Sequence, residues 1–355
     1  MNSIGLYIAS FLMAFVVSWA TTPLAKKIAF KFGAVAQPRK RDMHTKPIPR
    51  MGGIAIVSGF MVTLILLSHK VESLEAMQIT GIAIGGMMIC ILGIFDDKFE
   101  LSSKLKLTIQ LIAALVAVRC GITIEFLSVP FLPHFNLNWL SIPFTVVWIV
   151  GITNAVNLID GLDGLAAGVS SIAAICLMIL SIHSGHPTAV FLTASLAGSC
   201  FGFLPYNFNP ASIFMGDTGS TFLGYMLSVT SILGLLKSYT LGTVCIAVLI
   251  LGLPIFDTTF AIIRRILSGK PIMSPDRGHL HHRLVDKGYS HKHAVVTLYG
   301  VSGIFGLSAI GFVMSDVRFV VAIFIIMGIL FYYNARINAV SATETQPDSS
   351  PQSIN

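Results

Sequence analysis

The sequence has 355 residues, of which 54% are hydrophobic and only 11% charged, with a formal net charge of +7. Soluble globular domains carry about 25% charged residues, so this composition excludes a soluble globular protein and indicates an integral membrane protein. Loops of membrane proteins are rich in Lys and Arg, so the positive charge requires no nucleic-acid partner and we expect none. The five cysteines show no paired spacing, which argues against a disulfide framework or a zinc ribbon.

About eleven segments are apolar enough to cross a bilayer, which takes roughly 20 mostly apolar residues. In chain order they are residues 5–22, 52–69, 77–95, 107–124, 140–158, 165–184, 187–206, 219–236, 240–262, 294–313 and 317–335. The first has neither a basic leader nor a cleavage site, which predicts a retained span. We therefore expect an all-α polytopic membrane domain over residues 1–340 and a polar, disordered tail over residues 341–355.

Lys and Arg are shared unequally between the two sides of these spans. Most of the 23 lie on the side with loops 23–51, 96–106, 159–164, 207–218 and 263–293, and the other side has Lys70, Arg119, Lys237 and Arg318. The positive-inside rule predicts that the first side is cytoplasmic, with the N-terminus outside and the C-terminus in the cytoplasm.

Five aspartates fall on this predicted cytoplasmic side, at or beside the ends of spans: Asp96, Asp97, Asp160, Asp163 and Asp217. Ionisable residues at membrane depth indicate a functional site. Mg²⁺ binds one or two carboxylates together with water and substrate phosphate oxygens. Acids surrounded by Lys and Arg therefore predict a site for a divalent metal and a phosphorylated ligand.

The stretch NAVNLIDGLDGLAAG, residues 154–168, repeats polar side chains at intervals of three. If it forms a helical turn, Asp160 and Asp163 share one face with Asn154 and Asn157. Its glycines let a ligand or backbone approach closely. An ordinary glycine-rich turn would explain the glycines and leave the four polar residues unexplained.

The stretch YNFNPASIFMGDTGSTFLG, residues 206–224, is typical of a helix start, where free amides favour a carboxylate or phosphate. Asp217 alone is explained as well by a simple helix cap. Phe214 can stack on a base, although by itself it reads equally as an interfacial aromatic.

The longest basic loop contains HLHHR, residues 279–283. Three histidines suggest zinc, but no cysteine is near and the acids elsewhere favour a harder metal. Arginine and histidine donors converging on a pyrophosphate explain the cluster better than a loop that only sets topology. Lys46 lies in another basic, proline-stiffened loop, and Asp257 lies within a predicted span, where an ion pair with Arg264 is a structural explanation.

Taken in order, DD, NxxNLIDGLDGLA, NFNPASIFMGDTGS and HLHHR resemble the motifs of the polyprenyl-phosphate N-acetylhexosamine-1-phosphate transferases. The HxHHR form looks like the bacterial undecaprenyl-phosphate N-acetylglucosamine-1-phosphate transferases, of glycosyltransferase family 4 type. Phospho-N-acetylmuramoyl-pentapeptide transferases are similar elsewhere, but they carry three consecutive histidines there and a lysine where this chain has Glu100.

This resemblance implies an Mg²⁺-dependent enzyme, with Mn²⁺ as an alternative metal, at the cytoplasmic face of the bacterial inner membrane. It implies that UDP-GlcNAc and undecaprenyl phosphate give GlcNAc-diphosphoundecaprenol and UMP, the first membrane step of teichoic acid, O-antigen or similar glycan synthesis. Formation of a homodimer is left open by the sequence.

The resemblance also implies roles for individual residues. Asp217 is expected as the main Mg²⁺ ligand with Asp97 in support, and Asp96 as the group that takes the lipid phosphate's proton or orients it. Expected nucleotide contacts are Asn157, Asp160, Asp163, Asn207 and Phe214. Expected phosphate and sugar contacts are Lys46, Lys106, His279, His281, His282 and Arg283.

Two other classes of membrane protein remain for comparison. CDP-alcohol phosphotransferases require DGxxAR, whereas Asp160-Gly161 here is followed by Leu-Asp-Gly-Leu. A polytopic transporter would explain the spans equally well, but it would place ionisable residues near the bilayer midplane instead of at one surface.

Overall fold

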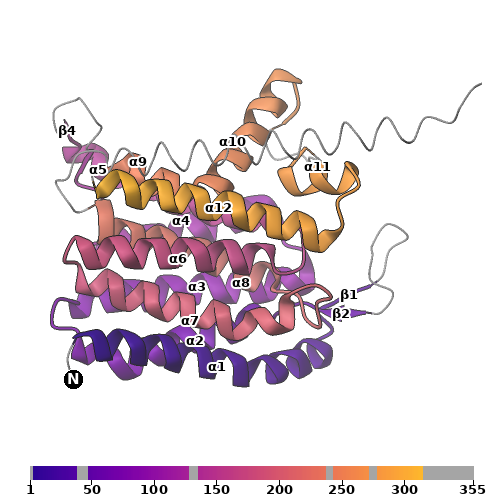
Figure 1. Ribbon diagram of the computed structural model, residues 1–355, viewed down its shortest axis with the longest axis horizontal. Coiled ribbons are helices and arrows are strands. Elements are labelled where there is room, and N and C mark those ends of the chain that lie inside the picture. The colour runs from indigo at the N-terminus through magenta and orange to yellow at the C-terminus, as the bar shows by residue number, and fades with distance from the viewer. Residues whose placement is uncertain (1–2, 38–46, 128–134, 237–242, 272–277, 315–355) are drawn as a thin grey trace, which may run out of the picture.

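In the computed structural model, residues 3–37, 47–127, 135–236, 243–271 and 278–314 are described. Long helices run side by side in one bundle, from which α10 projects (Figure 1). The helices are α1 Ser3–Phe32, α2 Gly53–Leu67, α3 Ala76–Phe99, α4 Ser103–Arg119, α5 Ser141–Ile159, α6 Leu165–His183, α7 Pro187–Asn207, α8 Gly216–Ser231, α9 Thr243–Ile250, α10 Gly252–Leu267, α11 Leu280–Asp286 and α12 His291–Val313.

Two short antiparallel strand pairs accompany the helices. Strands β1 Val35–Ala36 and β2 Ile48–Pro49 pair with Val35 opposite Pro49, and β3 Phe126–Leu127 pairs with β4 Phe135–Asn136. The β1–β2 pair and α11 lie at one end of the bundle, whereas β4 and the N-terminus lie at the other (Figure 1). The first end is called the α11 end below.

The predicted polytopic helical membrane protein is confirmed in outline. Within the described ranges, eight helices, some with a short turn attached, are long and apolar enough to cross a membrane, and a bent helix pair would make nine. The predicted number of eleven is not reproduced, because α4 has only 17 residues. The expected span at 317–335 and the tail at 341–355 lie outside the described residues.

The expected span at 240–262 is not one continuous helix. The chain breaks into α9 and α10, which meet at 88°. Gly252 begins α10 and Pro254 lies in its first turn, where the missing proline N–H has no intrahelical partner to lose. Because of this break, α9 stays in the bundle while α10 leaves it (Figure 1).

Helix α1 extends ten residues into the predicted loop 23–51, ending at Phe32. It packs closely on α7. A Cβ on Gly198 would lie 2.2 Å from the carbonyl oxygen of Phe11, and a Cβ on Gly202 would lie 2.3 Å from that of Phe15. Small residues allow such close backbone approach between membrane helices. The opposite face of α1 exposes large apolar side chains, as expected for a surface against lipid: Ile4, Ile8, Leu12, Val16 and Trp19.

Candidate active site at the α11 end of the bundle

The first turn of α8 lies directly against the backbones of two other helices. A Cβ on Gly53, the first residue of α2, would lie 2.1 Å from the amide nitrogen of Gly219. A Cβ on Gly93 of α3 would lie 2.3 Å from the Cα of Thr218. Only glycine permits these contacts. They bring the start of α8, with Asp217, against the end of α3, with Asp96 and Asp97.

Replacing Gly93 with alanine should destabilise the protein by about 1–3 kcal/mol, because the new methyl group collides with α8 backbone that cannot move alone. Gly151 of α5 is the matched control, since a Cβ there meets nothing within 4 Å. Gly151→Ala should leave stability unchanged or raise it by up to about 1 kcal/mol. Thermal unfolding in detergent measures both, and equal melting temperatures for the two variants would contradict the backbone contact.

Asp97 caps the N-terminus of α8. Its Oδ1 accepts a hydrogen bond from the Asp217 amide at 2.7 Å, and its Oδ2 accepts bonds from the Thr218 amide at 3.2 Å and hydroxyl at 2.6 Å. Gly216 has a φ of +73°, and a Cβ there would lie 2.5 Å from both carboxylate oxygens of Asp97. A carboxylate at a helix N-terminus is favourable for the free amides and the helix dipole. Asp97 therefore fixes the direction in which the Asp217 side chain points from the first turn of α8.

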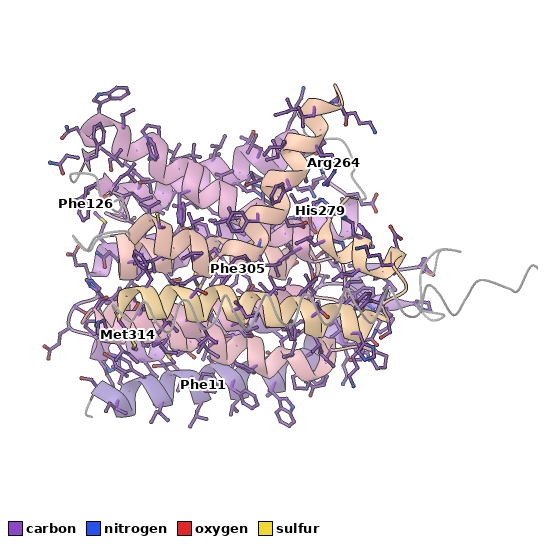
Figure 2. The ribbon with its side chains drawn as sticks, turned by 45° about the horizontal axis from the view of Figure 1, so that its top comes forward. Phe11, Phe126, Arg264, His279, Phe305 and Met314 are labelled. Atoms are coloured by element: carbon purple, nitrogen blue, oxygen red, sulfur yellow. The ribbon has the colours of Figure 1, made fainter. Side chains whose placement is uncertain are left out.

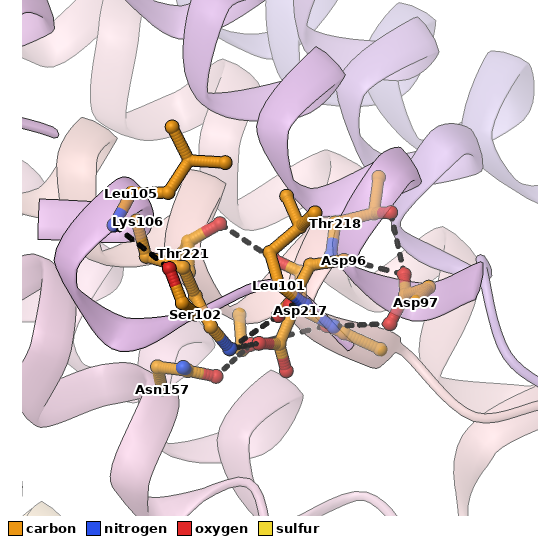
Figure 3. A network of polar contacts seen from close by, with 12 residues as sticks. Asp96, Asp97, Leu101, Ser102, Leu105, Lys106, Asn157, Asp217, Thr218 and Thr221 are labelled. Carbon is orange, nitrogen blue, oxygen red and sulfur yellow. Dashed lines mark hydrogen bonds and ion pairs between the residues drawn. The ribbon is translucent and has the colours of Figure 1, made fainter. Parts of the chain in front are cut away.

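Lys106 of α4 bridges two acids from different helices (Figure 3). Its Nζ forms an ion pair with Asp96 Oδ2 and donates to Asp217 Oδ2 at 2.9 Å. Asp96 is further held by the Leu101 amide, which donates to its Oδ1 at 2.7 Å. The Asp96 side chain is 4% exposed and the Asp217 side chain 31%. Asp217 is thus the accessible carboxylate of this pair.

Asp160 adds a third acid close by. Helix α5 ends at Ile159, so Asp160 and Asp163 lie in the loop after it and not on the continued helix that would carry them on one face. Burial raises the pKa of Asp160 to about 8, and the carboxylates of Asp217, Asp97 and Asp163 add to the rise. Burial and the neighbouring carboxylates therefore disfavour a negative charge on Asp160.

Asn157 lies on the last turn of α5, facing the start of α8. Its Oδ1 accepts a hydrogen bond from Ser220 Oγ at 2.7 Å. Asn154, one turn earlier, donates to Gln110 Oε1 of α4 at 2.7 Å. These two amides tie α5 to the helices that carry Lys106 and Asp217.

Like Asn157, three more of the predicted nucleotide contacts make hydrogen bonds within the protein. Asp163 Oδ2 accepts from Asn209 Nδ2 at 3.0 Å and from the Ala211 amide at 3.1 Å. Asn207 is only 2% exposed and joins the Gly164 amide to the Ile213 carbonyl. These bonds give Asp163 and Asn207 a structural task, and their expected contact with a nucleotide stays a prediction.

Phe214, the third of them, joins the α7–α8 connection to the segment before α2. Its amide donates to the Pro49 carbonyl at 2.9 Å, and its own carbonyl accepts from the Gly52 amide at 2.9 Å. The β1–β2 pair is thereby tied to the start of α8. The expected stacking of its ring on a base stays a prediction.

Tyr299 of α12 holds the loop of residues 160–164, called the acidic loop below, from the other side. Its hydroxyl donates to the Gly164 carbonyl at 2.5 Å, and its ring occupies the space beside Gly168, where a Cβ would lie 2.0 Å from the ring. Gly164 has a φ of +80°, which favours glycine. The sequence offered no signal for this residue, because a tyrosine in an apolar helix is ordinary.

The histidine segment, residues 279–283, reaches the acidic loop through His281. A Cβ on Gly161 would lie 2.2 Å from His281 Nε2, so the absence of a side chain at Gly161 lets the imidazole contact the loop backbone. The centroid of the His281 ring lies 4.2 Å from the centroid of the His282 ring and 5.8 Å from that of the His279 ring. Burial and, next, His282 lower the pKa of His281 to about 4. His281 is therefore neutral at pH 7.

Asp257 pairs with His279 rather than with Arg264, which had been the structural explanation for this buried acid. Oδ2 of Asp257 lies 2.8 Å from His279 Nδ1. Arg264 packs instead against Gly278, where a Cβ would lie 2.2 Å from the guanidinium carbon. Figure 2 shows Arg264, in the last turn of α10, close to His279. Arg283 is exposed, and Lys46 lies outside the described residues.

The acids suit a hard divalent cation better than zinc. Within the described ranges, no three His, Cys, Asp or Glu side chains surround one point as a complete metal site. Mg²⁺ does not require such a cage, since it commonly takes one or two carboxylates and completes its shell with water and substrate phosphate oxygens. The accessible Asp217 carboxylate, which is close enough to Asp160 for their charges to interact, fits that requirement.

Comparison with known proteins places this arrangement in a family. Residues 79–235 match glycosyl transferase family 4. The chain is 48% identical over 325 residues to the Probable undecaprenyl-phosphate N-acetylglucosaminyl 1-phosphate transferase of Bacillus subtilis (strain 168), covering 90% of this chain and 89% of that protein.

Two further relatives carry different names. The Decaprenyl-phosphate N-acetylglucosaminephosphotransferase of Mycolicibacterium smegmatis is 35% identical, over 86% of this chain and 82% of its own length. The Phospho-N-acetylmuramoyl-pentapeptide-transferase of Halalkalibacterium halodurans is 30% identical, over 85% of this chain and 95% of its own length. The matches therefore extend over most of the bundle.

Proposed function

This chain belongs to glycosyl transferase family 4, and we infer that it transfers N-acetylglucosamine 1-phosphate from UDP-GlcNAc to undecaprenyl phosphate. One product, GlcNAc-diphosphoundecaprenol, is the first membrane-bound intermediate of an envelope glycan. The other product, UMP, is released. The observation that carries this inference is the 48% identity, over 90% of the chain, to a relative with that name. The same region that aligns contains the Asp96–Lys106–Asp217 ion-pair group.

The reaction forms one phosphorus–oxygen bond and breaks another. An oxygen of the lipid phosphate attacks the β-phosphorus of UDP-GlcNAc, and the bond to the bridging oxygen breaks so that UMP leaves. Several anionic groups meet at this point, so catalysis consists mainly of positioning and charge stabilisation. Lys106 supplies a fixed cation, which its two carboxylate partners hold in place.

The metal role of Asp217 is part of this proposal. Asp217 would hold Mg²⁺, or Mn²⁺ in its place, with Asp97 acting in support by fixing the start of α8. The metal would neutralise charge on the diphosphate oxygens as the bond to UMP lengthens. Phosphate and sugar would be bound by Lys106 and the histidine segment His279–Arg283, where neutral His281 serves as a hydrogen-bonding group instead of a cation.

We propose that the site lies on the cytoplasmic face of the bacterial inner membrane. The donor is a cytosolic nucleotide sugar, and a lipid phosphate reaches a site at helix ends by moving within its leaflet. The excess of Lys and Arg in the loops of this side supports that orientation. The N-terminus lies at the other end of the bundle (Figure 1), which agrees with an external N-terminus.

Release of UMP tests the function directly. Purified protein in detergent, given UDP-GlcNAc, Mg²⁺ and polyprenyl phosphate, should release UMP, and omission of the lipid or chelation of the metal should stop it. Parallel reactions with UDP-GalNAc and UDP-MurNAc-pentapeptide should be much slower. Turnover of the pentapeptide donor alone would instead identify a phospho-N-acetylmuramoyl-pentapeptide transferase, and substrate uptake into vesicles without UMP release would identify a transporter.

Asp96→Asn should abolish turnover and leave UDP-GlcNAc binding intact. The substitution removes the charge that holds Lys106 and receives or orients the lipid phosphate's proton, but the new amide oxygen would still accept the Leu101 hydrogen bond. Turnover should fall by about 100-fold or more, the size of a lost general acid–base or electrostatic contribution. Calorimetry with UDP-GlcNAc checks binding. Retained turnover would exclude the catalytic role, and lost binding would place Asp96 among the donor contacts.

A further inference from the structure

We propose that Asp257 is a positioning residue that holds the histidine segment, through His279, in the conformation that binds the donor's diphosphate. This inference rests on the proposed function, and it concerns an acid that none of the predicted site contacts includes. Asp257 belongs to α10, the helix that leaves the bundle (Figure 1), and it lies 22 residues before His279 in the sequence.

Both oxygens of Asp257 hold the start of α11. Oδ2 lies 2.8 Å from His279 Nδ1, and Oδ1 accepts a hydrogen bond from the Leu280 amide at 2.8 Å. The side chains of Asp257 and His279 are each 5% exposed, so the pair is shielded from competing water. One carboxylate therefore orients the imidazole and caps the short helix that carries the next two histidines.

The carboxylate also selects the state of the His279 ring. A hydrogen bond to a carboxylate keeps a proton on Nδ1, which leaves Nε2 as the ring nitrogen free of this bond. The His279 ring is stacked on that of His281, with an interplanar angle of 11°, and His281 contacts the loop at Gly161. Moving His279 would therefore move the face that His281 presents to the acidic loop.

The location of Asp257 indicates that its contact with His279 has a role beyond filling space in the core. A buried charge in an apolar helix costs free energy unless it is paired, and hydrophobic residues could fill the same space at lower cost. Large apolar side chains of α10 are exposed, including Phe260 at 61% and Leu267 at 82%. Asp257 thus couples a lipid-facing helix to the histidine segment.

The test measures KM for each substrate in UMP release, together with the amount of folded enzyme. Asp257→Asn keeps an acceptor for the Leu280 amide but loses the charge, and it should raise KM for UDP-GlcNAc by about 10- to 100-fold, as for other residues that orient histidine ligands. KM for polyprenyl phosphate should stay unchanged. Asp257→Glu, which keeps the charge on a longer side chain, should give an intermediate KM and serves if the asparagine variant does not fold.

Thr258→Val is the matched control, because Thr258 is the next residue of α10 and its buried hydroxyl has no hydrogen-bond partner among the described residues. It should behave as the wild type. A double-mutant cycle adds the decisive comparison: if Asp257 acts through His279, Asp257→Asn should add nothing to the effect of His279→Asn.

Three results would overturn the proposal. These are multiplied effects in the double variant, an Asp257→Asn enzyme indistinguishable from Thr258→Val, and a loss limited to the amount of active enzyme with both KM values unchanged. Absence of UMP release by the wild-type protein would instead refute the proposed function, so the two failures are distinguishable.

Discussion

Replacing Lys106 with alanine should lower kcat by about 100- to 1,000-fold, the effect of removing one fixed donor from developing negative charge. The variant loses the only cation seen between Asp96 and Asp217 in the described part of the chain, and those two carboxylates then repel each other. Lys106→Arg keeps the charge but not the compact ammonium geometry, so it should recover part of the activity. Initial rates of UMP release measure both variants.

Lys104 offers a control on the same helix. It is exposed and lies two residues from Lys106, so the two side chains point in different directions. Lys104→Ala should stay within about twofold of the wild-type rate, as is usual for surface substitutions. Equal losses in Lys104→Ala and Lys106→Ala would mean that the general positive charge of α4, and not the bridge between the two acids, supports turnover.

The second large effect is expected for Asp217→Asn. An amide oxygen is a weaker ligand for a hard cation than a carboxylate, and the substitution also breaks the ion pair with Lys106. We expect kcat to fall by about 100- to 1,000-fold. Rates measured over a series of Mg²⁺ and Mn²⁺ concentrations should show that the remaining activity requires more metal.

Glu75→Gln is the control for loss of a carboxylate. Glu75 precedes α3 at the end of that helix remote from Asp96, and its exposed side chain caps no amide. It should leave both the rate and the metal dependence unchanged. An Asp217→Asn enzyme that is slow but has the wild-type metal dependence would remove Asp217 from the metal site and leave it as the partner of Lys106.

The sequence was informative where chemistry depends on residue type at a helix end. Acids at the ends of apolar segments predicted one site for Asp96, Asp97, Asp160, Asp163 and Asp217. The structure joins Asp96 and Asp217 through Lys106, and Asp160 is close enough to Asp217 for their charges to interact. The family could also be predicted from the sequence, because four motifs in a fixed order are specific to it.

Partners far apart in the chain were not predictable in this way. Asp97 and Asp96 are neighbours with identical side chains, yet one turns to cap α8 and the other turns to Lys106, because successive helical residues point about 100° apart. Asp163 and Asn207 likewise satisfy loop amides that only the folded chain brings near. Sequence motifs alone do not separate a residue that holds a site together from one that contacts the ligand.

The break between α9 and α10 was missed for a different reason. A hydropathy window averages over a bend, so apolar residues on both sides of Gly252 looked like one span. Gly252 and Pro254 were the available signal, since together they permit a new helix start. Spacing along α10 likewise pointed to Arg264 as the partner of Asp257, and it could not reveal His279, which lies 22 residues further along the chain.

In the loop after α5, Asp163 and Gly164 are held by hydrogen bonds to Asn207, Asn209 and Tyr299 of the protein itself. Fixing a loop during association costs roughly 1–2 kcal/mol of backbone entropy for each residue, and here that cost belongs to folding instead. Each turnover then begins and ends without reordering these residues. We therefore expect nucleotide association at this loop to carry a small penalty in backbone entropy.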